Sequence, residues 1–129
     1  DDAHHFKKFA RNLSNPGRGW VMVRARELTP SAIIDGLSRG DFYASTGVEL
    51  DEITTSGKRL ALKIRQFRLE KYRTEFIGKG GKVLKVDVSM EPSYELKPDD
   101  LYVRARVTSS SGDHAWTQPL YFDTQERTR

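Results

Sequence analysis

The stretch that decides the fold class of this sequence is Tyr102-Val103-Arg104-Ala105-Arg106-Val107. Apolar and polar residues alternate here with the two-residue period of a strand that has one buried and one solvated face. Val103, Ala105 and Val107 are therefore expected to face a core, while the tyrosine and the two arginines face outward.

The same period governs every apolar pattern after residue 47. It predicts strands at 48–54, 59–67, 72–77, 82–89, 101–109 and 114–122. Turn-forming residues separate these stretches, and the glycine-rich stretch 78–81 is predicted to be a hairpin turn. Short strands without crossover helices predict a mostly β protein built as an immunoglobulin-like antiparallel β-sandwich.

One helix is predicted before this β region. Residues 20–26 alternate as a strand does, and Thr29 then offers an N-cap oxygen ahead of Pro30. These signals predict a helix over 30–39 that ends at Gly40, with Leu28 packing on Ile33 as a hydrophobic staple.

A single βα unit cannot close a barrel or bury both faces of a sheet. The apolar helix face formed by Ile33, Ile34 and Leu37 is therefore expected to dock on the β domain or on a second copy of the chain, giving a homodimer.

Composition excludes several classes of protein. No stretch approaches the roughly 18 apolar residues of a membrane span, so no membrane partner is predicted. The absence of cysteine excludes a disulfide framework and thiolate chemistry, and it leaves the cellular compartment open. There is no Gly-x-Ser-x-Gly motif, and two of the three histidines are adjacent, which makes a nucleophilic triad improbable.

The positive charge is concentrated in residues 58–85, where 10 Lys and Arg face 2 Asp and Glu, a net charge of 10 − 2 = +8. Such a block can neutralise the phosphates of a polyanion, or it can be the solvated face of ordinary strands, and the second interpretation is favoured. Under the first, the candidate polyanion-binding residues are Lys63, Arg65, Arg68, Arg73 and Lys85.

The amino end reads Asp1-Asp2-Ala3-His4-His5. In an extended chain Asp2 and His4 lie on one face, and a carboxylate with an imidazole can bind a divalent ion such as Zn, Mn or Fe. Two ligands do not make a complete site, and the motif alone is also compatible with a solvated terminus.

Several segments together resemble the end of PHP-type metal-dependent phosphoesterases, the polymerase and histidinol phosphatase superfamily. They are Asp1-Asp2-Ala3-His4, Gly19-Trp20-Val21-Met22-Val23 and Arg39-Gly40-Asp41-Phe42-Tyr43-Ala44-Ser45-Thr46-Gly47. The stretches 102–107 and 115–122 resemble the C-terminal β extension of one branch of that family.

The resemblance implies a distorted βα barrel with two or three metal ions, whose bound hydroxide attacks a phosphoester. Asp2 and His4 match the final metal-binding motif as ligands, whereas the family's His-x-His motif and its other ligands have no counterpart here. The resemblance therefore predicts a C-terminal fragment, inactive alone, that has lost an N-terminal barrel domain and its phosphoester substrate site.

In this interpretation residues 1–47 are the remnant of the hydrolase domain, a leftover βα unit, and residues 48–129 are an accessory β-sandwich domain. The rival interpretation is a stand-alone basic β-sandwich that binds polyanions through the basic residues or carbohydrate through Trp20 or Trp116. The substrate, the metal and the oligomeric state are not predicted.

Overall fold

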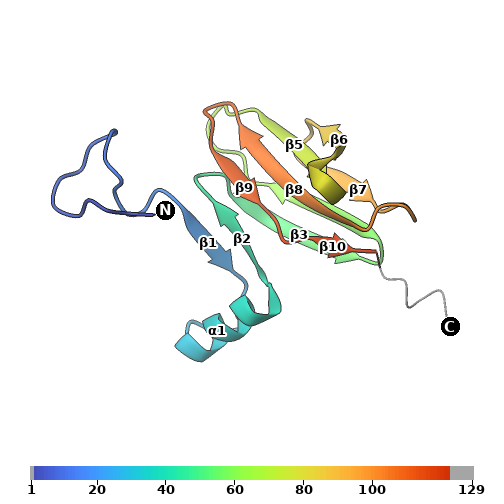
Figure 1. Ribbon diagram of the computed structural model, residues 1–129, viewed down its shortest axis with the longest axis horizontal. Helices are drawn as coiled ribbons and strands as arrows, with labels where there is room; N and C mark the ends of the chain where they lie inside the picture. The colour runs from blue at the N-terminus through green and yellow to red at the C-terminus, as the bar shows by residue number, and fades with distance from the viewer. Residues whose placement is uncertain (1, 123–129) are drawn as a thin grey trace.

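The computed structural model describes residues 2–122 as two antiparallel sheets and a single α-helix, which confirms the mostly β prediction (Figure 1). The end of the predicted second unit, residues 123–129, lies outside the described residues. The large sheet has the order β1 (Trp20–Val23), β2 (Phe42–Ser45), β9 (His114–Trp116), β8 (Tyr102–Ser109), β5 (Tyr72–Ile77) and β6 (Val83–Asp87), and β10 (Leu120–Tyr121) also pairs with β8. The small sheet has the order β3 (Leu50–Ser56), β4 (Arg59–Ile64) and β7 (Ser93–Glu95).

The two sheets enclose one core, as in a β-sandwich. Strand β8 alternates between buried and partly exposed residues along its whole length, and Val103, Ala105 and Val107 are each 0% exposed, as predicted. The large sheet also contributes Phe76, whose ring stacks on that of Tyr94 from the small sheet with centroids 5.7 Å apart. Burial of these apolar side chains is the main force that holds the sheets together.

The strand predicted at 114–122 is divided into β9 and β10. The backbone N–H of Thr117 donates to the carbonyl of Ala105 at 3.0 Å, and the Thr117 hydroxyl accepts the N–H of Ala105 at 2.9 Å. Pro119 then has no N–H to donate to a ladder. The strands β7 and β2 were not predicted. They have only three and four residues, which is too short to show a clear two-residue period.

The hairpin turn predicted at 78–81 joins β5 to β6 and contains the short 3-10 helix η1 (Lys79–Gly81). Gly80 and Gly81 have φ values of 70° and 79°, which side chains with a Cβ rarely adopt. The glycines thus serve the turn, as the sequence predicted.

The helix α1 (Pro30–Arg39) has the predicted bounds and caps. The Thr29 hydroxyl accepts the N–H of Ala32 at 3.3 Å, and Gly40 closes the helix with φ of 76°. The predicted staple is wrong, because Leu28 is 93% exposed.

The helix packs on β1. The two approach closely at Gly36, where an added Cβ would lie 2.8 Å from Val23 Cγ1 and 2.8 Å from the carbonyl oxygen of Arg24. Ile34 and Leu37 remain 62% and 39% exposed, so in the described chain this face does not dock on the β-sandwich as one prediction had it. Docking on a second copy stays a prediction.

The division near residue 47 also stays a prediction, and the sheet runs across it. Strand β2 pairs with β1 on one side and with β9 on the other, through Ala44↔Trp116 and Ser45↔Ala115. The βα unit is thereby joined to the β-sandwich by backbone hydrogen bonds (Figure 1).

Replacing Phe76 by alanine removes a fully buried ring and leaves a cavity, so we expect the free energy of unfolding to fall by about 3–5 kcal/mol in urea denaturation. Phe67→Ala is the matched control, since Phe67 is 60% exposed, and it is expected to change stability by about 0.5 kcal/mol or less. Equal losses in both variants would contradict the assigned core.

Stability is expected to fall in alkali through Tyr94. Burial and the Asp100 carboxylate, 2.5 Å from the phenol oxygen, raise the pKa of Tyr94 to about 12. Between pH of about 10, where the unfolded chain ionises, and about 12, the folded state keeps the proton and loses stability. Tyr94→Phe should remove this part of the pH dependence of unfolding, whereas the control Tyr121→Phe should retain it.

Candidate functional site

The Asp2 and His4 side chains lie close together at the surface. Asp2 Oδ1 is 3.8 Å from His4 Nε2, and the two side chains are 95% and 63% exposed. Asp2 has φ of 50°, a left-handed conformation that aspartate tolerates better than most residues. The carboxylate and imidazole are therefore juxtaposed and accessible, although the chain is not extended at Asp2 as the prediction assumed.

The ring of His4 is held in a defined orientation. Its Nδ1 lies 2.6 Å from the backbone carbonyl oxygen of Asp2, and because a carbonyl only accepts, Nδ1 must carry the proton. In the neutral ring Nε2 then has a free lone pair on the side of Asp2 Oδ1. Histidines that bind metals commonly have this arrangement, with one nitrogen donating to a carbonyl and the other open.

The loop formed by residues 4–15 is closed by hydrogen bonds and holds the backbone at His4. The backbone N–H groups of His4 and His5 both donate to the carbonyl oxygen of Ser14, at 2.8 and 2.9 Å. At the base of the loop the Asn15 side chain is 2% exposed, and it accepts from Ala10 N–H and donates to the carbonyls of His5 and Lys8. The loop is thus organised by one buried amide.

Asn15 was not singled out in the sequence, so this role was not predicted. The guanidinium of Arg18 adds further bonds to the carbonyls of Ala10 and Arg11 and to Asn15 Oδ1. The available signal was an asparagine before Pro16, since asparagine readily bonds to nearby backbone groups.

A carboxylate and an imidazole are suitable ligands for a divalent ion, but two ligands are fewer than a complete site requires. Their 3.8 Å separation is close to the roughly 3.4 Å between two ligands of a tetrahedral ion. Among residues 2–122, however, no three His, Cys, Asp or Glu side chains are placed to share an ion. Further donors would have to complete the site.

The basic residues do not gather on one surface. Lys63 is exposed on the outer side of the small sheet, and Arg65 follows the same strand, where Asp51 and Glu49 bind its guanidinium at 2.7 and 3.2 Å. These two carboxylates raise the pKa of Arg65 further and offset its charge.

The other three basic residues lie elsewhere. Arg68 is in the loop before β5, 5.2 Å from the centre of the Phe67 ring, and Arg73 pairs with Glu75 on the large sheet at 2.9 Å. Lys85 lies on β6, where it donates to the carbonyl of Ser93 at 2.8 Å and is 3.6 Å from Asp87. The five basic residues therefore do not share one face of the protein, and their joint binding to a polyanion stays a prediction.

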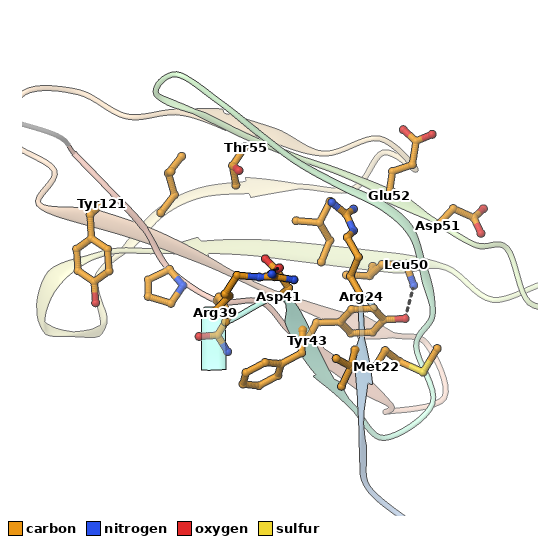
Figure 2. A pocket seen from close by; sticks show the side chains of 17 residues that line it. Met22, Arg24, Arg39, Asp41, Tyr43, Leu50, Asp51, Glu52, Thr55 and Tyr121 are labelled. Carbon is orange, nitrogen blue, oxygen red and sulfur yellow. Dashed lines mark hydrogen bonds and ion pairs between the residues drawn. The ribbon is translucent and has the colours of Figure 1, made fainter. Parts of the chain in front are cut away.

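A groove of about 690 Å³ separates the βα unit from the β-sandwich (Figure 2). Arg39 on one wall is bound by Asp35 and Asp41, at 2.6 and 3.0 Å. Across the groove, the Tyr43 hydroxyl accepts the N–H of Leu50 at 3.0 Å, shown as a dashed line. Asp2 and His4 do not line this groove, so it is separate from the candidate metal site.

No known protein family, curated protein or solved structure matches the chain. No helix in residues 2–122 has the length and apolar character needed to cross a membrane.

We expect Asn15→Ala to open the loop that carries the Asp2 and His4 pair, since it removes four hydrogen bonds of a buried amide. Amide hydrogen exchange at His4, His5 and Ala10 should accelerate about tenfold or more, while β8 amides stay protected. Asn12→Ala is the matched control, because Asn12 is exposed. Unchanged exchange in Asn15→Ala would contradict the role of the amide.

Proposed function

We propose that this chain is the C-terminal part of a PHP-like metal-dependent phosphohydrolase, in which Asp2 and His4 are two of the metal ligands. The observation that carries the proposal is the orientation of His4, whose Nδ1 donates to the Asp2 carbonyl while Nε2 faces the Asp2 carboxylate. The resemblance of the segments around residues 1–4, 19–23 and 39–47 to that superfamily supports the same assignment.

In the intact enzyme the metal ions would supply an activated water and would neutralise the phosphate oxygens. The part of this chain is to hold two donors in position. The loop clamped by Asn15 fixes the backbone of His4 and His5, so the imidazole loses little freedom when it binds. His5 belongs to the loop through its backbone, and no ligand role is assigned to its ring.

The exposed apolar surface of the βα unit supports the proposal that another domain packs against it. Within the described residues β1 pairs with β2 alone, so its other edge is open, and the side chains of Trp20, Val21 and Met22 on its two faces are 39–47% exposed. Open apolar edges are normally paired or covered. In the proposal this edge and the helix residues Ile34 and Leu37 pack on the barrel domain of the intact protein.

The β-sandwich is then the accessory domain, and we propose that its fold is immunoglobulin-like. Its two antiparallel sheets around one core are compatible with that type. Its attachment through β2 would keep it in a fixed position beside the hydrolase domain.

The first test measures the two donors in this chain. Titration with Zn²⁺ alone, followed by NMR of the histidine ring protons, should shift His4 at lower metal concentration than the other histidines. His4→Ala should weaken Zn²⁺ binding about tenfold or more, whereas the adjacent control His5→Ala should leave it unchanged. Equal losses from both variants would refute the assignment of His4.

The second test is a phosphatase assay of the chain with Mn²⁺ or Zn²⁺ and an aryl phosphate. Two donors do not complete a catalytic centre, so we expect no turnover above the metal-only rate. Robust turnover that His4→Ala abolishes would overturn the view that this chain needs a partner domain.

A further inference from the structure

In the described residues no second sheet or α-helix packs on the outer face of β8 and β9, although the outward residues Glu75 and Ile77 of the adjacent β5 are only 9% and 3% exposed. The one α-helix lies beyond the ends of β1 and β2, away from β5, β8 and β9 (Figure 1). Because β8 alternates and its inward residues fill the core, the intervening side chains must project from this face. Those that matter below are Tyr102, Arg104, Arg106, His114, Trp116 and Tyr121.

Two aromatic pairs lie on this face. Trp116 is opposite Arg106 in the ladder, and its ring is 5.3 Å from that of His114. Tyr121 is opposite Tyr102, and their rings are 5.8 Å apart. Their partners Tyr102 and Arg106 are four positions apart on β8, which is about 13 Å along an extended strand. The aromatic pairs therefore flank a central stretch of the face.

The central stretch is positively charged. Arg73 and Arg106 share a single carboxylate, Glu75, at 2.9 and 3.0 Å. Arg104 makes no ion pair with any described residue. Three guanidinium groups thus face one carboxylate, and this excess remains on a surface that also presents aromatic rings.

We infer that the outer face of β5, β8, β9 and β10 binds single-stranded nucleic acid. Bases would stack on the two aromatic pairs, and phosphates would lie against Arg104 and the remaining charge of Arg73 and Arg106. This combination of stacking platforms and cations on an open sheet is what single strands require, and it is independent of the proposed metal ligands.

The observations favour this ligand over two others. A neutral sugar could stack on Trp116, yet it would leave the excess positive charge without a partner. A duplex would need an element that enters a groove, and the face is a sheet surface. Of the basic residues singled out in the sequence, only Arg73 lies here, so the site is new in its composition.

The test uses Trp116 as the reporter. Trp20→Phe leaves Trp116 as the one tryptophan in the chain, and its fluorescence is followed during titration with an oligo(dT) 12-mer. We expect quenching, with an affinity that falls as salt rises. Arg104→Gln should reduce the slope of log K against log salt by about 0.7, the value for one phosphate contact on a single strand.

Two further variants separate stacking from charge. Tyr121→Ala, at a side chain 66% exposed, should weaken binding about fivefold or more without unfolding the protein, as checked by circular dichroism. Lys63→Gln, on the outer side of the opposite sheet, is the matched control and should leave affinity unchanged. An equal effect of Lys63→Gln and Arg104→Gln would overturn the assignment of the face.

Heparin and a neutral oligosaccharide complete the comparison. Quenching by the oligosaccharide but not by oligo(dT) would overturn the inference in favour of carbohydrate. Heparin binding with no response to oligo(dT) would also overturn it, because charge alone would then explain the surface. Quenching by oligo(dT) that is lost in Tyr121→Ala supports the inference.

Discussion

The alternation along β8 is the constraint on which the rest of this structure depends. One row of its side chains, Val103, Ala105 and Val107, is completely buried, and the strand is hydrogen-bonded to β5 on one side and to β9 and β10 on the other. A strand fixed in this way has no freedom to place its second row anywhere but outside. The apolar core and the arginine-rich outer face are thus two consequences of one register.

The amino-terminal loop is held by a different kind of force. Its bonds are made by polar groups, chiefly the Asn15 amide and the Ser14 carbonyl, and it does not share the core of the β-sandwich. Such a unit can open without unfolding the sheets. The proposed ligands Asp2 and His4 lie on a local support of this kind, and the proposal has donors from another element complete their site.

The basic residues of 58–85 are close in the sequence, but they do not form one positively charged surface in the structure. Residues 58–85 contain the basic block, yet this stretch runs through both sheets and a hairpin, so its cations point to different sides. Three of them meet carboxylates: Arg65 pairs with Asp51 and Glu49 around the start of β3, whereas Arg73 and Lys85 pair with Glu75 and Asp87 on their own strands. Charge that was concentrated in one block is largely offset or dispersed after folding.

The sequence by itself determined the elements that rest on local rules. The caps at Thr29 and Gly40 set the helix, and the two-residue period set most strands, because neighbouring residues decide these features. Asp2 and His4 lie side by side through a left-handed backbone at Asp2, not through the extended chain that the sequence suggested. Tertiary structure alone decided the pairing of β2 with two partners and the meeting of aromatic and arginine side chains on one face. These features depend on contacts between residues distant in the chain, and no local pattern encodes which strands become neighbours.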